Sequence, residues 1–171
     1  MINYSGTYKG LSGSQKDDTL IASDEDSVLY GGDGGSDRLV GGLGNDTLIA
    51  TSASVSDNNT DSDEDYLRGG AGSDNFVLIN PAEVNETLDK IYQVRIEDFN
   101  RFEGDRVTLV GYQNHEIALS DVDGENIQTA QITNVNNASE SLTIYFDLSI
   151  VRDFDAAFNL RMSDFDKIES A

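Results

Sequence analysis

The residues best suited to chemistry in this chain are aspartates at positions 18, 37, 46, 65 and 74, which recur at intervals of nine or 19 residues. In two places the sequence reads G-G-x-G-x-D, at 41–46 and at 69–74. Three glycines in four positions indicate backbone that adopts positive φ or lies very close to a neighbour. A carboxylate at the exit of such a turn, beside main-chain carbonyls, is a hard oxygen ligand. The pattern therefore predicts a site for Ca²⁺.

Other metals are poorly supplied by this sequence. Zinc and copper favour thiolate and imidazole ligands, and the chain has no cysteine and a single histidine, His115. Mg²⁺ tends to keep its water ligands and rarely enters a cage built from protein alone. Calcium is the cation that fits the residues present.

The same pattern continues in less complete copies of a nonapeptide. The sixth position of each copy and the apolar residue two places later form six pairs: Asp18 with Leu20, Ser27 with Leu29, Asp37 with Leu39, Asp46 with Leu48, Asp65 with Leu67, and Asp74 with Phe76. A polar, an apolar and a variable residue after each turn are typical of a very short strand with one inward side chain. A turn and a three-residue strand make half of one coil of a parallel β-roll.

Two nonapeptides per coil would stack alternate turns on opposite edges of the roll. Turns 13–18, 32–37 and 60–65 would line a first edge, and turns 22–27, 41–46 and 69–74 a second edge. A cation held between consecutive turns would then bind oxygens from both.

Asp46 and Asp74 should share the best of these sites, because their turns are complete. Ser27 supplies no charge, so Asp24 or Asp26 would have to replace it. We expect ~3–5 Ca²⁺ ions in all. The ligands predicted from the repeats are Asp18, Gly32, Gly34, Asp37, Gly41, Gly42, Leu43, Gly44, Asp46, Asp65, Gly69, Gly70, Ala71, Gly72 and Asp74.

Composition agrees with folding that depends on metal. The 171 residues carry a formal net charge of −21 and only 37% hydrophobic residues, a balance typical of disordered chains unless cations offset the charge. Nucleic acid is not an expected partner of such a polyanion. Without cysteine, disulfides cannot stabilise the fold. We expect a monomer without a membrane span or an N-terminal signal peptide, and a chain that is a fragment of a longer protein.

After Val77 the periodicity changes to the alternation of half-exposed strands, as in 90–96, 106–110, 127–132 and 142–146. The segment 156–162 reads as a last strand or a short helix. These strands predict an antiparallel sheet that caps the open end of the roll. We therefore expect an all-β chain with two domains, a calcium-binding β-roll at 10–80 and an antiparallel β cap at 81–171.

Two acidic stretches outside the repeats have simpler interpretations. The segment 57–65 resembles the start of an EF-hand loop but lacks its glycine and its final glutamate, so an exposed acidic loop is the favoured interpretation. The segment 121–126 contains Asp-Gly between strand-like runs and predicts a hairpin turn.

The complete copies resemble the calcium-binding nonapeptide repeat of RTX proteins, G-G-x-G-x-D-x-U-x. The segments 96–99 (I-E-D-F) and 104–109 (G-D-R-V-T-L) resemble the two elements that follow the last repeat in that family. The layout is similar to the R-modules of secreted mannuronan C5-epimerases and to the C-terminal domain of serralysin-type proteases.

The resemblance implies a right-handed parallel β-roll, type I secretion, and folding on calcium outside the cell. Relatives often have an aspartate where this chain has Val94, so a calcium site between the last turn and the cap would need Asp98 or Asp89.

The function that these observations favour is a non-catalytic, calcium-binding module that stabilises or targets an attached N-terminal domain. No nucleophile elbow, H-E-x-x-H motif or P-loop is present, and His115 is expected in a surface loop. One alternative is an alginate-binding R-module, in which Arg95, Arg106 and Lys90 would meet an acidic polysaccharide. Another is the C-terminal domain of a secreted protease or adhesin.

Overall fold

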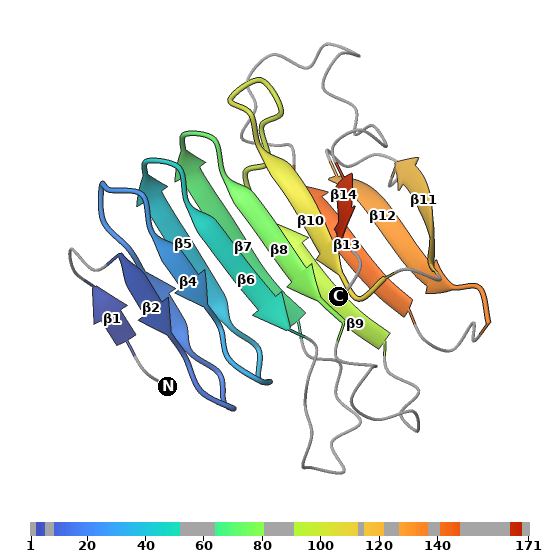
Figure 1. Cartoon of the computed structure of the whole chain (residues 1–171), viewed down its shortest axis with the longest axis horizontal. Helices are drawn as coiled ribbons and strands as arrows, with labels where there is room; N and C mark the ends of the chain where they lie inside the picture. Colours follow the sequence, from blue (N-terminus) through green and yellow to red (C-terminus); the bar gives the residue numbers. More distant parts are fainter. Residues whose placement is uncertain are drawn as a thin grey trace.

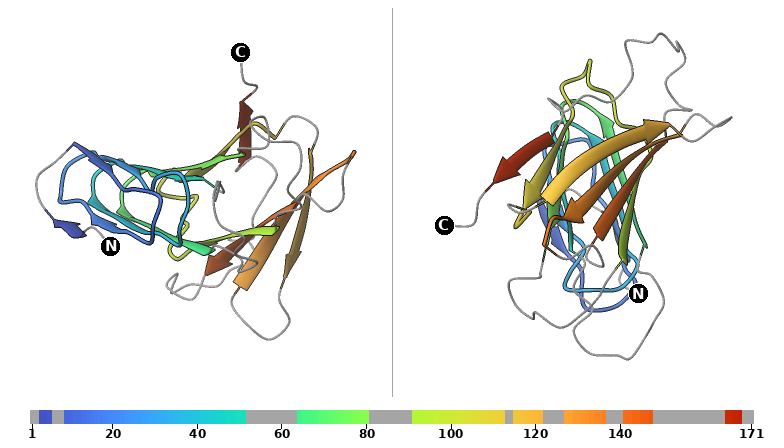
Figure 2. Two further views of the ribbon diagram at one scale, coloured as in Figure 1. Left: turned by 90° about the horizontal axis from the view of Figure 1, so that it is seen from below. Right: turned by 90° about the vertical axis from the view of Figure 1, so that its right-hand side faces the viewer.

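The computed structural model describes residues 3–5, 9–51, 64–80, 91–112, 115–121, 127–136, 141–147 and 165–168. Within these ranges the regular structure consists of strands without an α-helix, which confirms the all-β class. No helix long and apolar enough to cross a membrane occurs in the same ranges. The strands form an eight-stranded sheet and a six-stranded sheet that lie as two layers (Figures 1 and 2).

In the first half of the chain, successive strands alternate between the two layers. The eight-stranded sheet contains β1 (Asn3–Ser5), β3 (Thr19–Ile21), β5 (Arg38–Leu43) and β7 (Glu64–Ala71). The six-stranded sheet contains β2 (Gly10–Ser12), β4 (Val28–Tyr30), β6 (Thr47–Thr51) and β8 (Asn75–Ile79). All these neighbours pair in parallel, so each coil consists of two turns and two strands, as predicted for a parallel β-roll.

The strand register places the repeat leucines in straight rows. Leu20 pairs with Leu39 and Leu39 with Leu67 in one sheet, and Leu29 pairs with Leu48 and Leu48 with Phe76 in the other. All six side chains are fully buried between the layers. Because alternate residues of a strand face opposite sides, this register also superimposes the aspartates two positions earlier.

The roll continues further than the repeats do. β9 (Ile91–Ile96) pairs in parallel with β7, and β10 (Arg106–Val110) pairs in parallel with β8. We had expected antiparallel pairing throughout this half. Alternation of polar and apolar residues identifies a strand but leaves its direction open, and here Ile96 and Val107 extend the two apolar rows.

Antiparallel pairing among the described strands is confined to β11 (His115–Asp121), β12 (Ile127–Asn134) and β13 (Ser141–Asp147). β13 then joins β9 in parallel, and β14 (Phe165–Ile168) joins β10 in parallel. Strand pairing is therefore continuous past residue 80, and the division into two domains there stays a prediction. The segment 156–162 lies outside the described residues.

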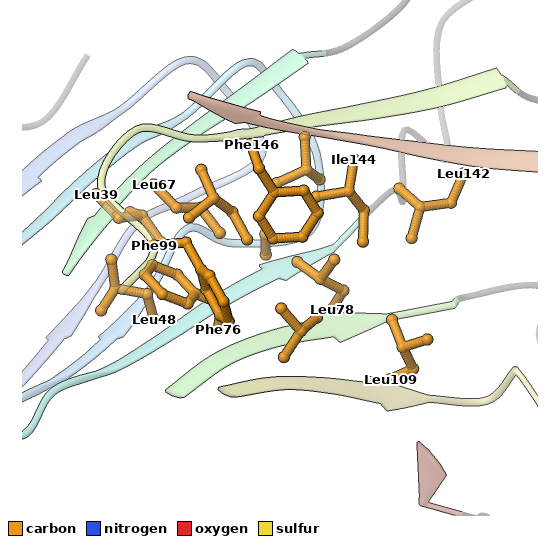
Figure 3. Close-up of a cluster of buried hydrophobic side chains, with 14 of the residues drawn as sticks. Leu39, Leu48, Leu67, Phe76, Leu78, Phe99, Leu109, Leu142, Ile144 and Phe146 are labelled. Atoms are coloured by element: carbon orange, nitrogen blue, oxygen red, sulfur yellow. The ribbon is translucent and has the colours of Figure 1, made fainter. Parts of the chain in front are cut away.

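Phenylalanines fill the space where the coils meet the last strands. Phe99 lies between Phe76 and Phe146 (Figure 3), with ring centroids 6.3 and 5.3 Å away. The Phe165 ring centroid lies 6.0 Å from that of Phe146. The interior thus changes from leucine rows inside the coils to an aromatic cluster at the far end. This continuous core holds the turns of neighbouring coils in register.

Candidate calcium sites

The sixth-position aspartates of successive coils are joined by a repeated hydrogen bond. On the first edge, Oδ1 of Asp37 accepts from the Asp18 amide at 2.9 Å, and Oδ1 of Asp65 accepts from the Asp37 amide at 2.8 Å. We call these repeated contacts, on either edge, the aspartate ladder. The carboxylates of Asp37 and Asp65 each reach back to the coil before them, which uses one of their two oxygens.

The second edge repeats this arrangement with the complete turns. Oδ1 of Asp46 accepts from the Ser27 amide, and Oδ1 of Asp74 accepts from the Asp46 amide, both at 2.8 Å. The ladder then goes one step beyond the repeats, because Oδ1 of Asp105 accepts from the Asp74 amide at 2.9 Å. Asp105 therefore occupies the sixth position of an additional coil.

Glycine is needed in these turns because consecutive turns almost touch. Gly70 and Gly72 adopt φ of +105° and +135°. A Cβ at Gly70 would lie 1.9 Å from the Gly42 carbonyl oxygen, and one at Gly72 would lie 1.8 Å from that of Gly44. The carbonyls of one turn thus face the glycines of the next, and the gap between turns is lined by main-chain oxygen.

The second carboxylate oxygen of each complete turn lies against the first glycine of its own turn. Oδ2 of Asp46 and Oδ2 of Asp74 are buried without a hydrogen-bond partner among the described residues. A Cβ at Gly41 would lie 2.4 Å from both Asp46 Oδ2 and the Gly69 carbonyl oxygen, so these two oxygens approach one another from successive turns. Buried oxygens without donors, all of them hard ligands, fit Ca²⁺.

The electrostatics of the ladder also favour a cation. Burial, together with neighbouring carboxylates, raises the pKa of Asp37 from 3.8 to about 8 and that of Asp74 to about 6. Amide hydrogen bonds to each carboxylate oppose this shift without cancelling it. The pKa of Asp46 is raised as well, mainly by burial. A divalent ion between the turns would supply the positive charge that these buried carboxylates lack.

Two other ladder aspartates have their second oxygen engaged by hydroxyl groups. Oδ2 of Asp18 accepts from the Ser14 amide at 2.6 Å and from the Ser14 hydroxyl at 2.8 Å. Oδ2 of Asp65 accepts a short hydrogen bond from the Tyr92 hydroxyl. Asp18 and Asp65 therefore differ from the carboxylates of the complete turns, because each accepts from an O–H donor.

The structure gives Asp98 a local role that its sequence pattern had not indicated. Its two carboxylate oxygens accept hydrogen bonds from the amides of Gly69 and Gly70, each at 2.9 Å. Nε of Arg68 lies 3.6 Å from Oδ2 of Asp98. Asp98 thus holds the start of the last complete turn. Its role as a calcium ligand stays a prediction.

Asp105 is the residue that the sequence analysis missed as a site candidate. Its Oδ2 accepts from the Asn100 amide at 2.8 Å, and burial is the main reason that its pKa is raised to about 7. A signal was present, since Asp105 stands two residues before Val107, just as each aspartate of the repeats stands two residues before a buried leucine or phenylalanine. The long spacing from Asp74 concealed it.

The fifth position of each nonapeptide forms a second, complementary series of contacts. Oδ1 of Asp26 accepts from the Asn45 amide at 2.8 Å, and Oδ1 of Asn45 accepts from the Ser73 amide at 2.9 Å. These side chains reach forward to the next coil, opposite to the ladder. Asp26 is therefore engaged in coil stacking, while Asp24 is exposed, and the structure places neither in the role of Ser27.

The remaining predicted carbonyl donors lie at the ends of strands and in the turns. Leu43 and Ala71 pair with each other where β5 and β7 end, and the Ala71 carbonyl accepts from the Gly44 amide at 2.9 Å. Gly32 and Gly34 adopt φ of +119° and +123° in the turn before β5. No three side chains of Asp, Glu, His or Cys gather as a metal centre within the described ranges, so sites there would draw on main-chain oxygen.

Arg95 and Arg106, predicted to contact polysaccharide, lie on different sheets. Arg95 of β9 pairs with Glu64 at 3.3 Å and lies over the Tyr145 ring, 5.2 Å from its centroid. Arg106 of β10 makes two hydrogen bonds to Asp166, at 2.7 and 2.6 Å. Lys90 lies outside the described residues. The two arginines do not form one patch.

His115 is buried, whereas the sequence analysis expected it in a surface loop. It is the first residue of β11, and its ring packs edge-on against Tyr112 with centroids 5.0 Å apart. The pairing of β11 with β12 confirms the predicted hairpin, although residues 122–126 of its turn lie outside the described ones. Most of the acidic segment 57–65 lies outside them too.

Comparison with known proteins agrees with this geometry. Four copies of the RTX calcium-binding nonapeptide repeat match residues 12–48 and 59–77. Among curated proteins, none matches the sequence. Two similar solved structures are subunits of a mannuronan C5-epimerase from Azotobacter vinelandii. AlgE6R2 is 19% identical with a TM-score of 0.52, and the match covers 91% of this chain and 90% of that one.

The other solved structure, AlgE6R3, is 22% identical with a TM-score of 0.48, and the match covers 88% of this chain and 87% of that one. The likeness to AlgE6R2 shows that the two chains share a fold. The matched repeats contain the glycines and aspartates that build the stacked turns. This chain therefore contains, at residues 12–48 and 59–77, repeats that match the RTX calcium-binding nonapeptide.

Proposed function

We propose that this chain is a non-catalytic module that folds when Ca²⁺ enters between its stacked turns, outside the cell, and that it stabilises or targets an attached domain. The observation that supports this most directly is the pair of buried oxygens, Asp46 Oδ2 and Asp74 Oδ2, which have no hydrogen-bond partner among the described residues. A buried carboxylate oxygen without a donor is costly unless a cation binds it.

The proposed ligands of the best site come from two consecutive turns of the second edge. Asp46 supplies a carboxylate oxygen, and Gly42, Gly44 and Gly69 supply carbonyl oxygens that face the gap. The bound ion would add two positive charges where the ladder has only negative ones. The number of ions, ~3–5, and the remaining ligands are proposed from the same repeat geometry.

The location outside the cell follows from charge and from the affinity expected of such sites. A chain with a net charge of −21 repels itself until cations bind, and extracellular calcium modules bind with dissociation constants of about 10⁻⁴–10⁻³ M. Such a module would stay unfolded at low calcium and fold where calcium is abundant. This behaviour suits a protein exported by a type I system.

Substitution of the two orphaned carboxylates tests the proposal. Asp46→Asn and Asp74→Asn keep an oxygen that can accept the ladder hydrogen bond but remove the charge that would bind calcium. Each should lower calcium affinity at least about tenfold in calorimetric titration, because a charged ligand is lost. Asp24→Asn is the matched control, since Asp24 is an exposed acid of the same edge. Equal affinities in all three variants would contradict the proposal.

Alginate binding is a narrower proposal that rests on the likeness to epimerase R-modules. No contact in the described residues favours it, because Arg95 and Arg106 each pair with a carboxylate on different sheets. Titration with alginate oligomers at low salt tests it, and Arg95→Gln should then weaken binding. If the chain has no detectable affinity for alginate, this narrower proposal is wrong and only the stabilising role remains.

A further inference from the structure

Asp65 differs from the other buried aspartates of the ladder in the partner of its second oxygen. Its Oδ1 accepts from the Asp37 amide at 2.8 Å, just as Oδ1 of Asp74 accepts from the Asp46 amide. Its Oδ2, however, accepts from the Tyr92 hydroxyl. The equivalent oxygens of Asp46 and Asp74 have no hydrogen-bond partner among the described residues.

Tyr92 reaches Asp65 because of its place in the next coil. β9 pairs with β7 in parallel, and this register sets Val94 opposite Asp65. Tyr92, Val94 and Ile96 alternate along β9 and are all buried. The coil that follows Asp65 therefore presents an apolar residue at the sixth position and a phenol two residues earlier.

The hydroxyl group is well suited to serve a buried carboxylate. Tyr92 is only 4% exposed. Burial, followed by the Asp65 charge, holds the pKa of Tyr92 well above its ordinary value, so the phenol keeps its proton. A hydrogen bond to a charged acceptor satisfies that oxygen without a cation.

At the opposite end of the first edge, a hydroxyl group also donates to the second oxygen of an aspartate. Oδ2 of Asp18 accepts from the hydroxyl and the amide of Ser14, which stands where the complete turns have their second glycine. Hydroxyl donors thus serve the first and last aspartates of the first edge. The complete turns of the second edge have glycines and offer no such donor.

We propose that Tyr92 closes the end of the first edge to calcium, because its hydroxyl takes the Asp65 oxygen that would otherwise face a cation. The inference rests on the proposed function, in which the equivalent oxygens of Asp46 and Asp74 bind calcium. Tyr92 is then the residue that determines where the row of calcium ions along the first edge ends. The first edge then holds fewer ions than its aspartates suggest.

The number of calcium ions bound at saturation, counted by native mass spectrometry and calorimetry with CaCl₂, tests this assignment. Asp65→Asn keeps an oxygen for the Asp37 amide, and it should bind as many ions as the unmodified chain. Asp46→Asn should bind one fewer at the calcium concentration that just saturates the unmodified chain, because its site is weakened. Tyr92→Phe keeps the ring and frees the Asp65 oxygen, so it should bind one more ion and depend more steeply on calcium for its melting temperature.

Tyr66→Phe is the matched control, because the Tyr66 hydroxyl also donates to a carboxylate, that of Glu64 at 2.8 Å, which is not one of the ladder aspartates. Its ion count should not change. Loss of an ion in Asp65→Asn would overturn the inference, as would an unchanged count in a folded Tyr92→Phe. If Tyr92→Phe fails to fold, Asp65→Asn alone decides. An unchanged count in Asp46→Asn would contradict the proposed function itself.

Discussion

The buried carboxylates predict an unusual pH dependence for the metal-free chain. Asp37, Asp105 and Asp74 have pKa values of about 8, 7 and 6, all above the ordinary 3.8 of an aspartate, and burial is the first cause for each. In the folded chain these groups therefore bind protons more tightly than in the unfolded chain. Folding stability is then greatest below the unfolded pKa and is lost as pH rises through the folded values.

The size of the effect follows from the shifts. Each pKa unit corresponds to about 1.4 kcal/mol, so the shift of Asp74 alone destabilises the metal-free fold by about 3 kcal/mol above neutral pH. Asp37 acts in the same direction. The three sites interact, and solvent near the turns screens them, so we expect a total of about 5 kcal/mol rather than the sum. That is comparable with the whole stability of a small domain.

Circular dichroism of protein stripped of metal on a chelating resin would measure how the stability of the metal-free fold depends on pH. The metal-free chain should be folded near pH 5, and its melting temperature should fall by about 10 °C or more as the pH rises toward 7.5, where the chain unfolds, since 1 kcal/mol corresponds to about 2–4 °C at this size. Added calcium should raise stability most at the higher pH, because the ion competes with protons for the carboxylates. Metal-free stability that is constant or rises with pH would refute the reasoning.

A general loss of charge on acidification could imitate this result, and two variants separate the causes. Asp74→Asn should reduce the pH difference, because it removes one of the buried titrating groups. Asp24→Asn removes the same charge from an exposed position and should leave the difference almost unchanged. If both variants reduced it equally, net charge rather than the ladder would explain the pH dependence.

Two further substitutions test the packing of the coils. Gly72→Ala should destabilise the chain by about 2 kcal/mol or more, because its Cβ would meet the Gly44 carbonyl at 1.8 Å in a backbone of positive φ. Gly10→Ala has open space and should change the melting temperature little. Phe76→Ala should cost about 3–5 kcal/mol in chemical denaturation with calcium present, since Phe76 is fully buried and packs on Phe99. A loss below about 1 kcal/mol would contradict this packing.

The coil architecture could be predicted from sequence because one spacing specifies several features together. Leu20, Leu39 and Leu67 align only if two nonapeptides form a coil, and the same alignment superimposes Asp18, Asp37 and Asp65. Glycines at fixed places then specify the turns. Each of these features follows from a spacing that repeats along the chain.

The features that escaped prediction depend on partners distant in sequence. The contact of Tyr92 with Asp65 spans 27 residues and exists only because β9 continues the sheet in parallel. Asp105 lies 31 residues from Asp74, outside any complete nonapeptide. A local sequence pattern specifies neither the direction of β9 nor the partner of a buried tyrosine. Both became clear only from the pairing of β9 with β7.

The hydrogen bonds between coils tolerate extra chain length between β6 and β7. The Asp18 amide and Asp37 are 19 residues apart and join at 2.9 Å, while the Asp37 amide and Asp65 are 28 residues apart and join at 2.8 Å. Nine additional residues have thus been accommodated without a change in this contact. The link between these strands is consequently a place where a foreign loop, an epitope or a folded domain could be grafted while the flanking coils keep their alignment.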